Sequence, residues 1–562
     1  MEAIVCGQNE IKSGFPRIIT CPNEMVALSM ADGYARLTGK PQCVIVHVDV
    51  GTQALAAAVH NASCGRAPVL IFAGLSPHTI EGEYRGSRTE FIHWLQDIPD
   101  QKQLVAQYCR YTSEIKAGRN IKQIVNRALQ FATSDPQGPV YLCGARETME
   151  EIIEPYSLDQ SLWEPVVSGP LAGDAVELIS IALVNAKSPL LVVGYSGRKA
   201  EGLSAAVAVA DQVPGLKVLD SGGSEVCFPA DHPAYLGFAY GVHEEIEKAD
   251  FILVVDCDVP WIPTRCKPTP GAKIIHIDID PLKQQMPVFY IPASARFKAD
   301  SALALNQISH HIKLNLSSEL GTEEHRKAGQ ERQRLYDTRQ QYLKDLAKPL
   351  SPPVSSVIQP HLLAAKVKAA VPSDTIFAIE AVTLTGAFAD QIAPVSPKSW
   401  INCGGGGLGW SGGGALGIKL ATDFEQRTPG NRHGTNQGRF VCQIVGDGTY
   451  MFSVPSSVYW IAGRYDIPIL TIVLNNKGWN APRKSLLLVH PDGEGSKVNN
   501  LDLHISFEPT PDYSGIAKAA TAGKCWGCSV STIEELLEQL PKAVQVVQSG
   551  VTAVLEVKLE TT

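Results

Sequence analysis

The chain has 562 residues, of which 44% are hydrophobic and 19% are charged. This balance is typical of a large folded protein with about three domains, each with its own core. The formal net charge of -8, without a long basic stripe, excludes nucleic acid as an expected partner. No apolar run reaches the roughly 18 residues needed to span a bilayer, and no basic-then-apolar signal opens the chain, so we expect no membrane contact and a cytoplasmic location. Thirteen cysteines, mostly in apolar segments, indicate reduced core residues and not a disulfide framework.

The first block of the chain, residues 1–155, alternates apolar runs with helix-prone stretches. The runs CVIVHV (43–48) and PVLIFAG (68–74) predict buried parallel strands of an α/β unit. Ahead of them lies the stretch CPNEMVALSMADGYARLTGKP (21–41), in which Glu24 opens a predicted helix. Taken alone, a glutamate in that position complements the helix dipole by less than about 1 kcal/mol.

A second α/β block, residues 165–315, follows a polar connection. Its predicted strands are PLLVVG (189–194), FILVVD (251–256) and KIIHIDID (273–280). Residues 316–357 then form a charged, helix-prone segment that ends in a Pro-Ser-rich linker. The charges of this segment indicate a solvated face more than a binding site.

The third block, residues 358–562, contains the glycine-rich stretch INCGGGGLGWSGGGALGIKLA (401–421). Clustered glycines followed by a helix of small residues allow backbone N–H groups to face a diphosphate. By itself a glycine cluster is more often a flexible loop than a phosphate-binding site. The stretch is therefore a candidate diphosphate site only in combination with other motifs.

The same block carries two polar turns after apolar runs. Gly446-Asp447-Gly448 follows VCQIV, and Asn475-Asn476 follows LTIVL. Both turns are predicted at the carboxyl ends of buried parallel strands, where open α/β sheets bind ligands. Asp447 offers an anionic oxygen and Asn476 an amide oxygen, and Mg²⁺ completes its octahedron with phosphate oxygens and water. A lone Gly-Asp-Gly is a common turn, so the pairing of the two turns is what indicates a magnesium site.

Together these motifs resemble the thiamine-diphosphate (ThDP) enzymes, a family that includes pyruvate decarboxylase, benzoylformate decarboxylase, acetolactate synthase and 2-hydroxyacyl-CoA lyase. The resemblance covers almost the whole chain and implies an α/β fold of three doubly wound parallel-sheet domains. These are a pyrimidine-binding domain (1–155), a central domain (165–315) and a diphosphate-binding domain (358–562), with residues 316–357 as helical segment and linker. The implied cofactors are ThDP and Mg²⁺. FAD or a nucleotide occupies the central domain of some relatives; this sequence leaves that alternative open and contains nothing that supports FAD.

The resemblance also assigns roles to residues. Asp447, Asn476 and the main-chain carbonyl of Gly478 would hold the metal. Glu24 would be catalytic, because its carboxylate would hydrogen-bond the aminopyrimidine and favour the tautomer that removes the proton from thiazolium C2. Leu408 would hold the two cofactor rings face to face. The implied cofactor-binding residues are Glu24, Glu380, Gly407, Leu408, Gly446, Asp447, Gly448, Thr449 and Asn476.

Further residues bear on the reaction. Alignment with benzoylformate decarboxylase places His47 on the catalytic histidine of that enzyme and His232 on a second histidine, which makes both candidate catalytic residues. His47 either exchanges protons with a reacting group or is a strand-end residue satisfied by backbone. His232 precedes a proline, and His-Pro recurs there across the family as a structural element. Arg88 and Trp479 stand in regions where pyruvate decarboxylases carry histidines and a glutamate, so simple pyruvate decarboxylation is not expected. Arg88 either pairs with a substrate carboxylate or lies at the surface.

The expected function is cleavage or formation of a carbon–carbon bond on a small 2-oxo acid, as in acetolactate synthase. The alternatives are non-oxidative decarboxylation, as in benzoylformate decarboxylase, and cleavage of a 2-hydroxyacyl-CoA. A non-catalytic scaffold or regulator is the hypothesis from a different class, and the presence of Glu24, Asp447 and Asn476 argues against it. The family draws its glutamate and its metal site from different subunits, so a homodimer or homotetramer with an interfacial active site is implied. The segment before Glu24 is shorter than in the family, which predicts either another strand in that place or an open sheet edge.

Overall fold

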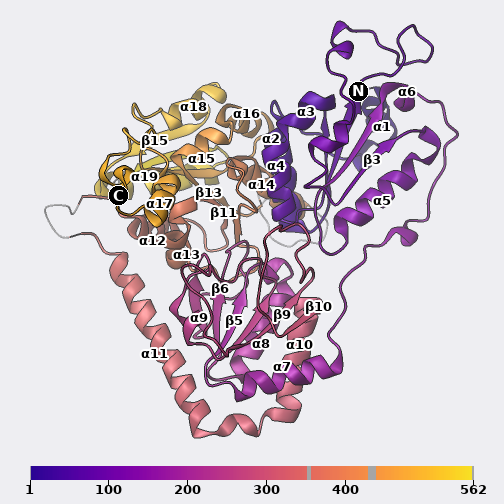
Figure 1. Ribbon diagram of the computed structural model, residues 1–562. Helices are drawn as coiled ribbons and strands as arrows, with labels where there is room; N and C mark the ends of the chain where they lie inside the picture. Colours follow the sequence, from indigo (N-terminus) through magenta and orange to yellow (C-terminus); the bar gives the residue numbers. More distant parts are fainter. Residues whose placement is uncertain (1, 351–355, 428–437, 560–562) are drawn as a thin grey trace.

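The computed structural model describes residues 2–350, 356–427 and 438–559, and it contains three parallel sheets flanked by helices (Figure 1). In Figure 1 the N-terminal and C-terminal domains lie beside each other, and the central domain lies below both. This architecture confirms the predicted fold class of three doubly wound parallel-sheet α/β domains. In the described ranges, no helix has the length and apolarity required to cross a membrane.

The N-terminal domain has a four-stranded parallel sheet in the order β1-β2-β4-β3. Its edge strand β1 is half exposed, with 59% of Ile45 accessible, whereas β4 is buried throughout. The described residues before β1 contain helices and no strand, so β1 is an open sheet edge, the second of the two expected arrangements. The strands are β1 Gln42–Val46, β2 Val69–Leu75, β3 Tyr111–Ile115 and β4 Val140–Ala145, and the helices are α1 Glu2–Ile11, α2 Glu24–Thr38, α3 Val48–Ala54, α4 Ala56–Cys64, α5 Ile121–Thr133 and α6 Arg146–Met149.

The central domain has a six-stranded parallel sheet in the order β10-β9-β8-β5-β6-β7. Because β5 lies between β8 and β6, the strand order reverses there and leaves a crevice outside the carboxyl ends of these strands. The strands are β5 Pro189–Val193, β6 Lys217–Asp220, β7 Tyr235–Phe238, β8 Phe251–Val255, β9 Lys273–Asp278 and β10 Ala295–Lys298, and the helices are α7 Gly173–Asn185, α8 Ala200–Gln212, α9 Glu244–Lys248 and α10 Ser301–His311.

The charged segment after the central domain forms one long helix, α11 (Glu323–Leu346), which runs along one side of the molecule toward the C-terminal domain (Figure 1). Arg332 donates to the carbonyl of Ala210 at 2.8 Å, and Arg339 pairs with Asp390 at 2.6 Å. The helix therefore joins the central domain to the C-terminal domain through a few polar contacts, and most of its side chains remain solvated.

The C-terminal domain has a six-stranded parallel sheet in the order β12-β11-β13-β14-β16-β15. Strands β11, β13 and β14 are buried almost throughout, as their continuous apolar sequence predicts. The strands are β11 Ile376–Glu380, β12 Trp400–Asn402, β13 Val441–Gly446, β14 Leu470–Asn475, β15 Trp526–Val530 and β16 Ala553–Lys558, and the helices are α12 Pro360–Ala370, α13 Thr385–Ile392, α14 Trp410–Arg427, α15 Asp447–Phe452, α16 Pro455–Tyr465, α17 Asn480–Val489, α18 Tyr513–Ala520 and α19 Ile533–Gln548.

Helices α2 and α14 join the N-terminal and C-terminal domains through direct backbone contact. A Cβ atom on Gly417 would lie 1.9 Å from the carbonyl oxygen of Met30, and one on Gly33 would lie 2.3 Å from that of Gly414. Only residues without a Cβ atom allow this approach. The helix that begins at Glu24 is therefore held against the helix that follows the glycine cluster.

Candidate active site

Asp447 and Asn476 follow the carboxyl ends of two neighbouring parallel strands. Strand β13 ends at Gly446 and β14 at Asn475, and the register pairs Gly446 with Leu474. The residues after the two strands therefore emerge at the same sheet edge. Asp447 is 3% exposed and Asn476 is 9% exposed. The structure thus brings two of the predicted metal ligands to one buried edge.

Backbone N–H groups surround the carboxylate of Asp447. Gly448 donates to Oδ1 at 2.7 Å, and Gly478 donates to Oδ2 at 3.1 Å. Burial raises the pKa of Asp447 to about 6, and these N–H groups limit the rise. Thr449 is buried in the same turn. A bound cation would stabilise this carboxylate, because it would offset the charge penalty that burial imposes.

Asn476 has a buried side-chain oxygen, Oδ1, that no hydrogen-bond donor among the described residues reaches. Leaving such a group unpaired costs about 1–3 kcal/mol, which is expected where a ligand completes the site. The neighbouring Asn475 is satisfied instead: its Nδ2 donates to Glu556 Oε1 at 2.6 Å, and its Oδ1 accepts from the N–H of Lys477 at 3.0 Å. Asn475 fixes the turn, and the Asn476 oxygen fits the role of a metal ligand.

Glu380, at the end of β11, binds the first residues of α14. Its Oε1 accepts hydrogen bonds from the N–H groups of Gly409 at 2.9 Å and Trp410 at 3.2 Å, and its Oε2 accepts from Ser411 at 2.7 Å. Burial raises the pKa of Glu380 to about 7, although the helix N-terminus favours its negative charge. The first N–H groups of α14 are therefore engaged by a carboxylate of the protein, and a contact of the glycine-rich stretch with a diphosphate stays a prediction. A contact between Glu380 and the cofactor stays a prediction.

The clustered glycines before α14 pack against α4 of the N-terminal domain. Asn61 Nδ2 donates to the carbonyl of Gly407 at 2.6 Å, and the N–H of Gly407 donates to Asn61 Oδ1 at 3.0 Å. A Cβ atom on Gly404 would lie 2.4 Å from the Cα atom of Gly65, so the close approach requires glycine. The glycines thus dock two domains and fix the position of Leu408, the next residue.

The segment that carries Leu408 also touches the turn that carries Asp447. Gly409 has a φ of +103°, and a Cβ atom there would lie 2.4 Å from the carbonyl oxygen of Phe452, the last residue of α15. A Cβ atom on Gly448 would lie 2.5 Å from the ring of Trp479. Leu408 and the predicted metal ligands therefore belong to one surface of the C-terminal domain.

Glu24 and His47 lie together in the N-terminal domain. Glu24 is the first residue of α2, and His47 is an exposed residue just before α3. The carbonyl of His47 accepts from the N–H of Gly51 at 2.7 Å, and a Cβ atom on Gly51 would lie 3.5 Å from Glu24 Oε1. Within the described ranges, no hydrogen bond or ion pair engages the Glu24 carboxylate, and none joins this pair to Asp447.

His232 lies apart from the Glu24–His47 pair and from the sheet edge that carries Asp447 and Asn476. It lies in the central domain, where Nε2 pairs with Asp211 Oδ1 at 2.9 Å and Nδ1 accepts from the N–H of Ala234 at 3.0 Å. Both ring nitrogens are therefore occupied, which favours the structural alternative for His232, and its catalytic role stays a prediction. Arg88 pairs with Asp97, which favours the structural alternative for that residue too.

Sequence reasoning missed Asn61 and the different roles of the two asparagines in Asn475-Asn476. The partner of Asn61 lies 346 positions away along the chain, so no local pattern indicates the contact. The asparagine doublet did contain a signal, because two adjacent amides after a buried strand cannot both point into the same space.

Three models of the thiamine pyrophosphate enzyme family match the chain, one in each domain; thiamine pyrophosphate is another name for ThDP. The model of the N-terminal TPP binding domain matches residues 9–104, and the model of the central domain matches residues 176–307. The model of the C-terminal TPP binding domain matches residues 381–557.

Curated relatives align with most of the chain at low identity. Benzoylformate decarboxylase of Pseudomonas aeruginosa is 24% identical over 522 residues, which cover 88% of this chain and 87% of the relative. The acetolactate synthase large subunit of Haemophilus influenzae is 24% identical over 536 residues, which cover 93% and 84%. The 2-hydroxyacyl-CoA lyase 2 of Bos taurus is 24% identical over 509 residues, which cover 82% and 73%. Because the three names denote different reactions, the specific activity stays open.

Solved structures share the fold. The thiamine diphosphate-dependent 4-hydroxybenzoylformate decarboxylase of Rhodococcus jostii has a TM-score of 0.76 at 22% identity, covering 99% of this chain and 95% of that one. Benzoylformate decarboxylase from Polynucleobacter necessarius has a TM-score of 0.74 at 18% identity, covering 99% and 94%. With three domain models matched in order and the predicted residues gathered at strand ends, the chain belongs to the thiamine pyrophosphate enzymes, a family of ThDP-binding 2-oxo acid decarboxylases, lyases and synthases.

Proposed function

We propose that this chain is a ThDP- and magnesium-dependent enzyme that breaks or forms the carbon–carbon bond next to the carbonyl of a 2-oxo acid. The chemistry that bound ThDP supplies is a carbon nucleophile for the carbonyl and an electron sink for the bond that breaks. The chain's own residues bind the diphosphate through the metal, orient the reacting groups and move protons. The observation that carries the proposal is the unpartnered Oδ1 of Asn476 beside the buried carboxylate of Asp447.

Asp447, Asn476 and the carbonyl of Gly478 would hold the metal. In the part of the chain that the structure describes, no group of three or more His, Cys, Asp or Glu side chains is placed to hold a metal ion. A set with one carboxylate and two neutral oxygens suits Mg²⁺, which keeps coordination positions for phosphate oxygens and water. The site therefore depends on the diphosphate for much of its negative charge.

Glu24 would hold the aminopyrimidine ring by a charge-assisted hydrogen bond, which supports the proton transfer that activates the cofactor. Since no described contact joins Glu24 to Asp447 within one chain, we propose that Glu24 of one subunit faces Asp447 of another in a homodimer or homotetramer. Size-exclusion chromatography with light scattering measures the oligomeric state. A monomer at assay concentration would contradict this part of the proposal.

The substitution Glu24→Gln tests the mechanism. It keeps the size of the side chain and removes its charge, so ThDP binding measured by calorimetry should stay close to the wild-type value. Turnover should fall by at least about a hundredfold, the usual contribution of a positioned proton-transfer group. Glu323→Gln is the matched control, because Glu323 is also the first residue of a helix and loses the same interaction with the helix dipole. Equal turnover of Glu24→Gln and wild type would refute the assignment.

A cluster of three aromatic side chains beside the Asp447 turn bears on the substrate. The rings of Phe452 and Trp479 lie 5.6 Å apart, and those of Trp479 and Phe507 lie 4.8 Å apart, both edge-on. Phe452 is 52% exposed, so an aromatic surface is available next to the candidate site. Flat apolar groups pack well on such surfaces. Decarboxylation of an aryl 2-oxo acid is therefore a second candidate beside carboligation of the acetolactate synthase type.

Product analysis separates the two candidates. The enzyme is incubated with pyruvate or benzoylformate, each with and without an aldehyde acceptor, and the products are identified by NMR. Carboligation predicts a hydroxy ketone or a hydroxy acid that contains both carbon skeletons. Aldehyde as the sole product in every mixture would contradict the carboligase hypothesis. Asp447→Asn serves as the control that distinguishes enzymatic from spontaneous reaction.

A further inference from the structure

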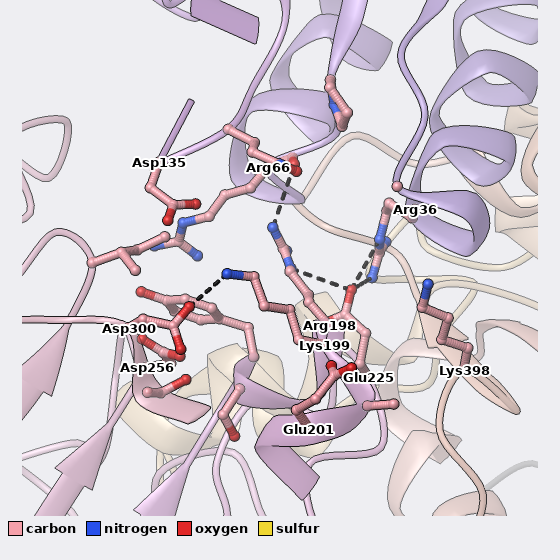
Figure 2. Close-up of a pocket in the computed structure, with 18 of the residues that line it drawn as sticks. Arg36, Arg66, Asp135, Arg198, Lys199, Glu201, Glu225, Asp256, Asp300 and Lys398 are labelled. Carbon is pink, nitrogen blue, oxygen red and sulfur yellow. Dashed lines mark hydrogen bonds and ion pairs between the residues drawn. The ribbon is translucent and has the colours of Figure 1, made fainter. Parts of the chain in front are cut away.

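A cavity of about 410 Å³ lies where the three domains meet, and its lining includes none of the residues assigned above. The N-terminal domain contributes Arg36 and Arg66, the central domain contributes the residues before α8, and the C-terminal domain contributes Lys398. Figure 2 shows Arg198 in the middle of these side chains, with Arg36 and Lys398 on one side and Lys199 on the other. Basic groups from three domains thus face one space.

Two arginines share one carboxylate at this junction. Arg36 donates to Glu225 Oε1 from Nε at 3.1 Å and from Nη2 at 2.6 Å, and both side chains are buried. The Nε atom of Arg198 lies 3.6 Å from the same oxygen, too far for a hydrogen bond, and its buried Nε and Nη2 have no hydrogen-bond partner among the described residues. Burial lowers the pKa of Arg198, Glu225 opposes this shift, and Arg66 and Arg36 add to it. Arg198 therefore lacks an anionic partner of its own.

The loop between β5 and α8 adds further donors. Ser196 is 3% exposed, and its hydroxyl has no partner in the described part of the chain. The 13-residue helix α8 begins at Ala200, so its first N–H groups carry partial positive charge near the cavity. Lys199 already pairs with Asp300 at 2.5 Å. Arg198 Nη1 donates to the carbonyl of Arg66 at 3.4 Å, whereas Arg198 Nε and Nη2 and the Ser196 hydroxyl are donors without acceptors among the described residues.

The acidic residues of the cavity do not supply the missing charge. Glu225 and Asp300 are each paired with a basic side chain named above. Burial raises the pKa of Asp256, which favours its neutral form. Asp135 accepts a backbone N–H at 3.0 Å, and Glu201 is exposed. An added anion would therefore meet an excess of unpaired donors.

Arg66 separates this cavity from a second one of about 340 Å³ at the ends of the central strands. Its guanidinium lies 3.6 Å from the centre of the Tyr195 ring and pairs with Asp258 at 2.9 Å. An extended flavin dinucleotide along the carboxyl ends of β5 and β8 would have to displace this stacked and paired side chain. The residues present therefore do not fit FAD, and they leave room for a compact ligand.

We propose that the cavity binds a compact oxyanion, a phosphate or phosphate monoester, with Arg198 as its main ligand and Ser196 and the start of α8 as further donors. The planar guanidinium matches the spacing of phosphate oxygens. Because Arg36 and Lys398 bring the other two domains to the same cavity, the bound oxyanion stabilises the packing of all three. It is a structural ligand, distinct from the substrate of the candidate active site.

Phosphate titration of the protein loaded with ThDP and Mg²⁺ tests this proposal, since the active site is then occupied. Calorimetry should show saturable binding of inorganic phosphate, and the melting temperature should rise with its concentration, because a ligand of the folded state stabilises it. Sodium chloride at the same ionic strength should give no such rise. Glycerol 3-phosphate in a parallel titration distinguishes a monoester site from a site for free phosphate. The absorbance spectrum should show no flavin bands.

Two variants and a control complete the test. Arg198→Met should weaken phosphate binding at least about tenfold, the factor that corresponds to one charge-assisted hydrogen bond. Without phosphate it should melt no lower than wild type, because it removes a charge that shares the Glu225 carboxylate with Arg36 and makes no hydrogen bond to it. Ser196→Ala leaves every charge in place and should weaken binding by a smaller factor. Arg334→Met, on the exposed face of α11, should change nothing. The proposal would be overturned if wild type showed no saturable phosphate binding, or if Arg198→Met bound phosphate as tightly as wild type. Bound flavin in the purified protein would overturn the argument that Arg66 excludes FAD.

Discussion

Replacement of Gly417 by alanine tests the backbone contact between α2 and α14. Two effects of opposite sign compete at this position. Alanine is a better helix former than glycine by about 0.8–1.0 kcal/mol, so helix propensity alone predicts a more stable protein. The new Cβ atom, however, would lie 1.9 Å from the carbonyl oxygen of Met30, far inside van der Waals contact.

The magnitudes decide which effect wins. Overpacking costs about 1–3 kcal/mol when side chains can adjust, and more where the obstacle is backbone. Here the obstacle is a backbone carbonyl. A Cβ atom on the neighbouring Gly33 would lie only 2.3 Å from the carbonyl oxygen of Gly414, so the two helices must separate as units. A cost of about 3 kcal/mol less a gain of about 1 kcal/mol leaves a net loss of about 2 kcal/mol. For a domain of this size, that lowers the melting temperature by about 4 to 8 °C.

Differential scanning calorimetry of wild type, Gly417→Ala and a matched control measures the difference. The control is Gly386→Ala in α13, where a Cβ atom would meet no atom within 4 Å. There the propensity gain acts alone, so this variant should melt at or slightly above the wild-type temperature. If Gly417→Ala melted as high as Gly386→Ala, the two helices would not be in backbone contact and the described domain packing would be wrong.

Three more outcomes are expected. The pKa of Asp447 is raised from the ordinary 3.8 to about 6, so the metal-free protein should lose stability as the pH rises through this window. The variant Asp447→Asn should not show that loss. Urea unfolding of both metal-free proteins at pH 5 and pH 8 measures the difference. Magnesium affinity, measured by calorimetry in the presence of ThDP, should fall below about pH 6, because the metal requires the carboxylate; a constant affinity down to pH 5 would exclude Asp447 as a ligand. Asn61→Ala removes two hydrogen bonds to Gly407, worth about 1–3 kcal/mol together, and should weaken ThDP binding by up to about a hundredfold. Asn126→Ala, which removes an exposed amide pair in the same domain, should leave ThDP affinity unchanged.

The parts of the site that could be predicted from the sequence are those that depend on a few consecutive residues. A buried apolar run followed by a polar turn predicts a strand end, and two such runs in one parallel sheet place their turns at the same edge. Asp447 and Asn476 follow that rule, and the observed register of β13 and β14 places them there. The fold class could be predicted for the same reason, because strands alternate with helices along the whole chain.

The parts that could not be predicted depend on contacts between distant residues. The glycine cluster has the local pattern of an anion site, yet Asn61 and Glu380 engage its N–H groups from other elements. Whether those N–H groups face a ligand or a side chain is decided by packing that no local window contains. For His232, alignment shows the position of a residue and not its partners, Asp211 among them.

The contact between α2 and α14 has a consequence for an assembled dimer of the proposed kind. In one chain, α14 begins just after Leu408, which would serve that chain's own cofactor, while α2 begins at Glu24, which would serve the cofactor held by the other chain. Because the two helices touch through their backbones, neither can shift alone. A displacement that accompanies binding at one active site would therefore be transmitted to the glutamate of the second, and the two sites would respond to ligands as a coupled pair.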